Sequence, residues 1–177
     1  MKKFAFVTLL ALALAICSCG HTIPTAITNT EANGNWEAEL TPSAGMNGLS
    51  FVTTFSVIDT APLDITAFGF INSGPCFATG LDQEPVSGSA SFGTNTGTGQ
   101  VTGTLTYIVH SSVPPGNLLT LNGQLSGTSN GTTTTTGTLS NGVVWGTWTL
   151  TNGPETPQCT GTGNFIMCQG TATCSIP

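Results

Sequence analysis

Residues 101–125 read VTGTLTYIVHSSVPPGNLLTLNGQL, and this stretch decides the fold class. In its first half, Leu105 and Tyr107 alternate with threonines. In its second half, Leu119 and Leu121 alternate with polar residues. A period of two is typical of a strand with one buried and one wet face. The Pro-Pro-Gly between the two halves interrupts the pattern. The stretch therefore predicts two strands joined by a loop.

The same alternation recurs along the rest of the chain. The expected strands cover residues 36–40, 49–57, 65–72, 85–92, 101–109, 119–125, 132–139, 143–150 and 163–168. Asn-Gly pairs, which favour turns, occur at 47–48, 122–123, 130–131, 141–142 and 152–153. Asn141-Gly142 is the best candidate for a tight hairpin, because both central residues of a type I′ turn need a positive φ.

The strand pattern predicts an all-β fold. We expect an antiparallel meander of about 8 or 9 strands that closes into a small β-barrel, with a β-sandwich as the alternative. Closure would remove exposed sheet edges, which this chain has few lysines to protect. Thr suits the wet face of such strands because its branched β-carbon favours extended backbone.

The N-terminus has the pattern of a targeting segment. Two lysines precede the apolar residues 4–16, a run too short to span a bilayer. The next residues, ICSCG at 16–20, resemble the lipobox of bacterial lipoproteins, which implies lipidation of Cys19. Gly20 follows that cysteine, and by the same resemblance the destination is the outer membrane of the cell envelope. Ordinary secretion, with cleavage after Ala15, is the alternative.

These features divide the chain into three parts. We expect a signal peptide over 1–18, a lipidated cysteine with a flexible tether over 19–33, and a single all-β domain over 34–177.

The charge of the mature chain excludes several functions. The only basic residues are Lys2 and Lys3, so the remainder carries eight acids and no Lys or Arg, a formal charge of −8. A chain without cations cannot neutralise phosphates, so nucleic-acid binding is not expected. We expect a monomer that meets the membrane through its lipid anchor.

Four cysteines remain after processing: Cys76, Cys159, Cys168 and Cys174. An even number in an oxidising compartment predicts two disulfides, and three connectivities are possible. We favour Cys76 with Cys159, and Cys168 with Cys174. A four-thiolate zinc site is the alternative, but the mature chain has no C-x-x-C pair.

The residue inventory offers little for catalysis, and we expect no enzyme, no metal and no cofactor. No G-x-S-x-G nucleophile motif occurs, and His110 is the only histidine away from the predicted anchor. The paired acids are interpreted as solvated loop residues; they are Asp59 with Asp64 and Asp82 with Glu84. Residues 82–84 lack the pattern of a dedicated calcium loop.

Several short motifs carry a family resemblance. Gly34-Asn35-Trp36 opens the first expected strand, as a Gly-x-Trp motif does in lipocalins and avidin-like barrels. Further motifs are Gly74-Pro75-Cys76, Gly146-Thr147-Trp148, and Cys159 followed by Gly161, Gly163 and Phe165. The layout resembles that of uncharacterised Gly/Thr-rich bacterial lipoproteins with a lipobox and a small lipocalin- or avidin-like β-barrel. The resemblance also implies the pairing of Cys76 with Cys159.

These observations lead to two functional hypotheses. The first is a non-catalytic envelope lipoprotein whose tethered barrel binds a small apolar ligand or an envelope protein. Its binding residues would be Trp36, Tyr107, Trp145 and Trp148. The second is a structural or protease-inhibitor-like surface lipoprotein with a packed core and no ligand cavity.

Overall fold

The computed structural model describes residues 33–44, 49–60, 63–95, 98–129 and 139–170. Their regular structure consists of nine strands: β1 (Gly34–Pro42), β2 (Phe51–Thr60), β3 (Leu63–Asn72), β4 (Gly80–Leu81), β5 (Val86–Asn95), β6 (Gln100–His110), β7 (Leu118–Ser129), β8 (Leu139–Thr151) and β9 (Gly161–Gln169). The predicted all-β class is confirmed for these residues. Within them, no helix has the length and apolar character needed to cross a membrane.

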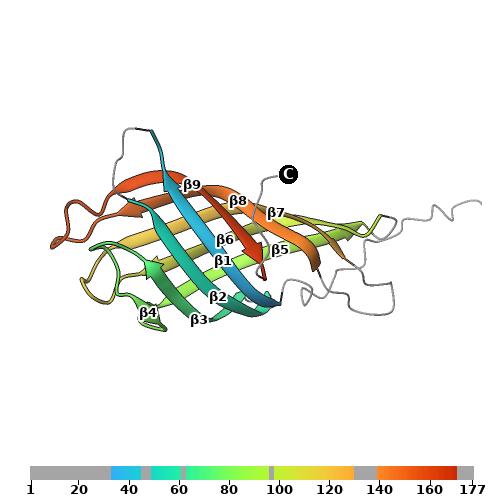
Figure 1. Ribbon diagram of the computed structural model, residues 1–177, viewed down its shortest axis with the longest axis horizontal. Coiled ribbons are helices and arrows are strands. Elements are labelled where there is room, and N and C mark those ends of the chain that lie inside the picture. Colours follow the sequence, from blue (N-terminus) through green and yellow to red (C-terminus); the bar gives the residue numbers. More distant parts are fainter. Residues whose placement is uncertain (1–32, 45–48, 61–62, 96–97, 130–138, 171–177) are drawn as a thin grey trace, which may run out of the picture.

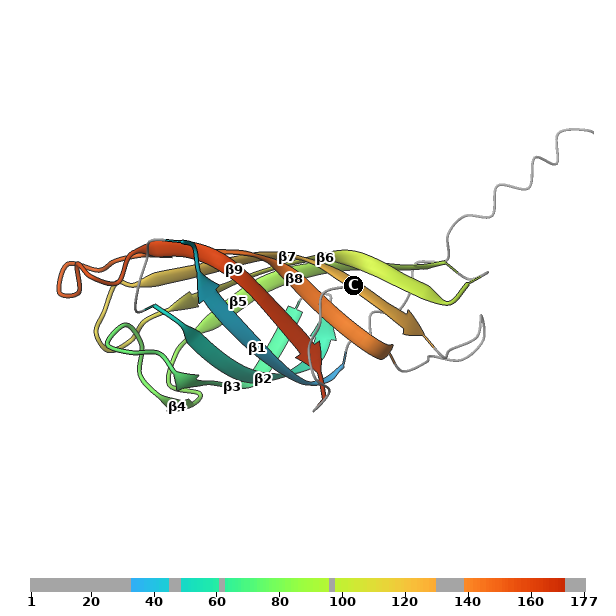
Figure 2. The same cartoon turned by 45° about the horizontal axis from the view of Figure 1, so that its top comes forward.

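All nine strands form one antiparallel sheet, in the order β4-β3-β2-β1-β9-β8-β7-β6-β5. Strands that follow one another in sequence are paired, except β4 and β5, and β1 pairs with β9. The sheet edges are therefore β4 with β3 and β5, which come from the middle of the chain. Figures 1 and 2 show the sheet curling into a half-barrel. The predicted meander is confirmed.

The half-barrel is not closed by hydrogen bonds. β3 and β5 lie next to each other, yet within the described parts of the chain no ladder joins them. We call this gap between β3 and β5 the seam. It leaves the outer edge of β5 without strand partners, which is unusual for a ten-residue strand with no charged side chain.

Aromatic rings fill the concave side of the sheet. Phe51 meets Trp148 edge to face at 5.7 Å between ring centroids, and Phe70 stacks on Phe77 at 4.6 Å. Tyr107 lies 5.7 Å from Phe55 in a T-shaped contact. Such pairs add to the stabilisation from apolar burial. The interior is therefore packed with side chains that come from strands on both sides of the seam.

Two of the predicted turns are wrong. Asn141-Gly142 lies within β8, and Asn122-Gly123 lies within β7. Both glycines serve close packing: a Cβ on Gly123 would lie 2.6 Å from the Phe165 ring, and one on Gly142 would lie 2.5 Å from Leu139. The strand expected over 132–139 falls almost wholly outside the described residues. The two-residue strand β4 was not predicted.

The antiparallel order places the loops at two ends of the half-barrel. The loops 73–79, 111–117 and 152–160 share one end, which we call the crosslinked end. The start of β1 and the finish of β9 lie together at the opposite end, because Trp36 pairs with Gln169. Figure 1 shows the long loops on the left, and the start of β1 away from them near the lower centre of the view.

Candidate functional site

A disulfide holds the crosslinked end together. Cys76 is bonded to Cys159 across a sequence separation of 83, and both residues are fully buried. The favoured pairing of these two cysteines is confirmed. Cys168 is disulfide-bonded as well, while Cys174 lies outside the described residues.

Asn117 joins the same three loops through hydrogen bonds. Its side-chain amide Nδ2 donates to the carbonyl of Cys76 at 2.7 Å. Its Oδ1 accepts from the backbone N–H of Gly153 at 2.6 Å and from the hydroxyl of Thr156 at 2.7 Å. Asn117 is 1% exposed, so these bonds form away from water, where an unpaired polar group is costly. The loops are thus fixed relative to one another.

Glu84 forms a second polar link beside Asn117. Its Oε1 accepts from the backbone N–H of Ala78 at 2.7 Å, and its Oε2 accepts from the backbone N–H of Ser112 at 2.5 Å. One carboxylate therefore connects the loop before β4, the link between β4 and β5, and the loop after β6. The side chain is 5% exposed, so the interpretation of Glu84 as a solvated loop acid is wrong.

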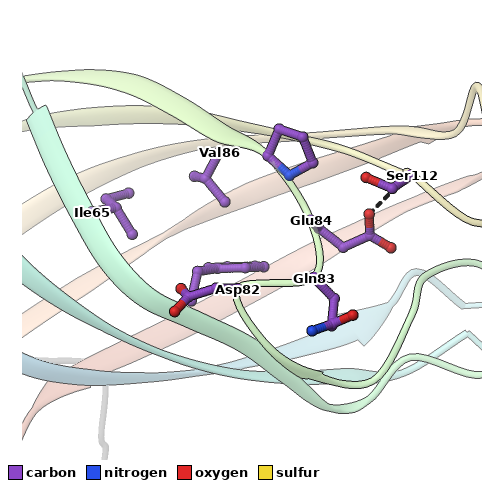
Figure 3. A pocket seen from close by; sticks show the side chains of 8 residues that line it. Ile65, Asp82, Gln83, Glu84, Val86 and Ser112 are labelled. Atoms are coloured by element: carbon purple, nitrogen blue, oxygen red, sulfur yellow. Dashed lines mark hydrogen bonds between the residues drawn. The ribbon is translucent and has the colours of Figure 1, made fainter.

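A pocket opens at the seam next to Glu84. It is an open hollow of about 230 Å³ between β3 and the start of β5. Its lining consists of Ile65, Phe68, Asp82, Gln83, Glu84, Pro85, Val86 and Ser112. Figure 3 shows Ile65 and Val86 on one side, Asp82 and Gln83 on the other, and the bond from Ser112 to Glu84. We call this cavity the seam pocket.

The local backbone explains the shape of the seam pocket. β4 pairs with β3 only at Gly69 and Phe70, and a Cβ on Gly69 would lie 2.8 Å from the Gly80 carbonyl. After β4, the N–H of Asp82 donates to the Phe68 carbonyl at 2.6 Å. Asp82 has a φ of 54°, a left-handed conformation that Asp tolerates better than most residues. The chain therefore turns sharply and holds Asp82 against β3.

The seam pocket is negatively charged and has no internal counter-ion. Asp82 and Glu84 both belong to its lining, with the Glu84 carboxylate turned toward Ser112 in Figure 3, and Asp82 is exposed. The described residues contain no Lys or Arg, and His110, exposed at the end of β6, is their only histidine. They also contain no group of three or more potential metal ligands. The charge of a largely buried carboxylate thus remains without a cation inside this part of the chain.

The four residues predicted to bind a ligand do not form one cluster. Trp36, Tyr107 and Trp148 lie inside the half-barrel and are at most 3% exposed. Trp145 lies three residues before Trp148 on the same strand and therefore points to the outer face. Since β8 is one strand, this odd spacing was the signal in the sequence that the two indoles would separate.

Trp148 and Tyr107 have different polar surroundings in the interior. The indole N–H of Trp148 donates to the Thr41 carbonyl at 3.0 Å. The Tyr107 hydroxyl and the Thr53 hydroxyl are both buried, and neither makes a hydrogen bond of good geometry within the described part of the chain. Burial raises the pKa of the Tyr107 hydroxyl above its ordinary value, and the nearby Thr53 hydroxyl opposes this effect in part.

The seam pocket was not predicted from the sequence. Its lining comes from three segments between residues 65 and 112, and only the pairing of β3 with β4 and β5 with β6 brings them together. The one local signal was the pair of acids Asp82 and Glu84 directly before a strand. Comparison of the whole chain with protein-family models, with curated proteins and with solved structures gave no match.

Proposed function

We propose that this chain is a non-catalytic lipoprotein of the bacterial outer membrane that binds another envelope protein through its crosslinked end. The observation that carries the proposal is the separation of the two ends of the half-barrel. β1 starts at one end, so a lipid anchor on Cys19 would hold that end toward the membrane. The loops joined by Asn117 and by Cys76–Cys159 would then face away from it.

The packing of the interior supports a surface interaction over a ligand held inside the barrel. Trp148 and Tyr107 are fully buried against other rings, so they offer no face to an apolar ligand. The crosslinked end instead exposes Val113, which is 70% accessible on the loop 111–117. That loop is fixed at its base, because the Ser111 N–H donates to the Asn117 carbonyl at 2.9 Å. A pre-ordered loop costs less entropy on binding than a flexible one.

Lipid anchoring is tested with the two N-terminal cysteines. In the full chain, Cys19→Ser should abolish membrane association and the incorporation of labelled fatty acid. Cys17→Ser is the matched control and should leave both unchanged, because that residue would be removed with the signal peptide. Fatty-acid labelling that survives Cys19→Ser would refute the anchor.

The binding end is tested by photo-crosslinking in intact cells. A photoreactive residue at Val113 should give a discrete protein adduct, whereas the same residue at Thr147, exposed on the outer face of β8, should not. An adduct from Thr147 alone would move the interface to the sheet wall. Absence of an adduct from both positions would contradict a protein-binding role.

The loop around Val113 also favours a second candidate function, protease inhibition. Inhibition needs an exposed, ordered loop, and 111–117 combines the exposed Val113 with a base held by Asn117 and Glu84. The purified chain should then inhibit a protease that accepts valine, and Val113→Asp should remove the inhibition. Cleavage of the wild-type loop without inhibition would exclude this candidate.

A further inference from the structure

We propose that the seam pocket receives one cationic side chain, Arg or Lys, from the protein partner. The inference rests on the proposed function, because it names the chemistry by which that partner is recognised. Three properties of the seam pocket carry it: its volume, its charge and its apolar walls.

The volume fits a single side chain. An apolar cavity of about 150 Å³ holds one benzene molecule, whereas pockets for drug-sized ligands enclose about 300–1,000 Å³. The seam pocket, at about 230 Å³, falls between these sizes. It is therefore suited to one long side chain that projects from a partner's surface.

The charge of the pocket calls for a cation. Glu84 is 5% exposed, and acidic residues are rarely buried to this degree without a paired charge. From the described residues its two oxygens accept two backbone N–H groups, which orient the carboxylate but do not neutralise it. Asp82 adds a second, exposed carboxylate, and no hydrogen bond to it is formed by the residues that the structure describes.

The apolar walls favour an organic cation over a metal ion. Ile65 and Val86 form one side of the pocket in Figure 3, and Phe68 also belongs to the lining; such apolar residues suit the aliphatic stem of Lys or Arg. A calcium ion takes 6–8 oxygen ligands, and a wall of hydrocarbon cannot supply them. The stem would lie along the apolar residues, with the charged head at the acidic side of the pocket that Asp82 and Glu84 form.

The described residues hold no Lys or Arg that could fill this pocket. The two lysines of the sequence, Lys2 and Lys3, lie in the predicted signal peptide, and the sequence contains no Arg. We therefore expect the cation to come from another molecule. A protein rich in exposed Arg or Lys would also be steered toward a chain whose mature part carries only acids.

The binding experiment uses three peptides that differ at one residue. The full chain, processed in the envelope of the producing cell and solubilised in detergent, is titrated with acetyl-Gly-Arg-Gly-amide and followed by amide NMR. The same peptide with citrulline keeps the shape of arginine without its charge, and the third peptide has Lys. The Arg and Lys peptides should shift the amide signals of Ala78 and Ser112, and citrulline should bind at least about tenfold more weakly.

Two matched variants test whether the cationic side chain binds at the seam pocket. Asp82→Asn removes one charge and keeps a residue that tolerates a positive φ, so the fold should be preserved. It should weaken binding of the Arg peptide by about five- to tenfold. Glu155→Gln removes the same charge from an exposed site outside the pocket lining and should change binding by less than about twofold.

Three results would overturn the inference. Equal binding of the citrulline and Arg peptides would show that charge is not recognised. Equal loss in Asp82→Asn and Glu155→Gln would show that only net charge matters. If calcium alone shifts the amide signals of Ala78 and Ser112 and the Arg peptide then causes no further shift, the pocket binds a metal ion. Because none of these results depends on lipidation or on the Val113 crosslink, they are separable from failure of the proposed function.

Discussion

The crosslinked end and the sheet wall formed by β5–β8 are stabilised in different ways. The wall relies on long backbone ladders and an apolar inner face, and its only ionisable side chains are His110 and the buried Tyr107. The crosslinked end has little backbone pairing, and it is held by a disulfide, Asn117 and Glu84. Loops cannot satisfy their backbone polar groups through a ladder, so the side chains of Asn117 and Glu84 do so, while the disulfide holds the loops together. Alternating polar and apolar residues are therefore sufficient to form the wall, whereas the structure of the crosslinked end depends on a few individual residues.

Removal of the disulfide should have the largest effect on stability. The double variant Cys76→Ala with Cys159→Ala lacks a link that closes a loop of 83 residues, worth about 4.5 kcal/mol of unfolding free energy in the loop-entropy model. Denaturant unfolding measures the loss. Hydrogen exchange should show faster opening of the loop 111–117 than of β6 and β7. An equal increase in the exchange rates of the loop and of the two strands would contradict the distinction between the two regions.

Truncation of the two nearby indoles should separate inner from outer face. Trp148→Ala removes a fully buried ring and its bond to Thr41, and should cost about 3–5 kcal/mol. Trp145→Ala, on the outer face of the same strand, should cost about 1 kcal/mol. Thermal or denaturant unfolding of both variants provides the comparison. Similar losses would mean that the outer face is also part of a packed interface.

Loss of Asn117 should be more costly than loss of an asparagine in the wall. Asn117→Ala leaves the Cys76 carbonyl, the Gly153 N–H and the Thr156 hydroxyl without their partner, at about 2–4 kcal/mol in total. Asn122→Ala is the control, because Asn122 is exposed on β7 and accepts one bond from Thr106. Its cost should stay below about 1 kcal/mol. Equal costs would contradict the role of Asn117 in joining the loops.

Tyr107 should make the wall sensitive to alkaline pH. Burial raises the pKa of its hydroxyl in the folded state, so above pH 10, the ordinary value, only the unfolded chain releases this proton. Stability is then fully present below pH 10 and decreases by up to about 1.4 kcal/mol per pH unit above it. Tyr107→Phe removes the only tyrosine and should abolish this slope while leaving stability at pH 7 nearly unchanged. Unfolding titrations from pH 7 to about 11 measure both chains, and identical slopes would exclude Tyr107 as the cause.

Much of the fold was predictable because alternation along a strand is a local property. The threonines beside Leu105 and Leu121 indicated half-buried strands, and those strands pair as neighbours in the sheet. The Asn-Gly pair at 141–142 misled the prediction, since a dipeptide can favour a turn and still lie in a strand where a side chain such as Leu139 needs the space. The choice between these roles depends on packing, which no short motif encodes.

The candidate site was much less predictable than the fold. Asp82 and Glu84 were visible as acids, but the burial of Glu84 depends on Ala78 and Ser112, which come from two other loops. Trp145 was also expected to line the interior of the half-barrel. It points outward because successive side chains of β8 alternate between the two faces of the sheet. Site geometry thus arises from contacts between segments that the sequence does not place side by side.

By itself the sequence determined that this protein is an antiparallel β protein with no Lys or Arg after residue 3, and it indicated the link between Cys76 and Cys159. These properties follow from composition and from the alternation of polar and apolar residues within single strands. That alternation involves only residues that are close in sequence. Only the tertiary structure decided that β1 pairs with β9, that the half-barrel stays open between β3 and β5, and that Glu84 is buried at that seam. Each of these depends on how curvature and twist bring distant strands together, and that is a property of the whole sheet.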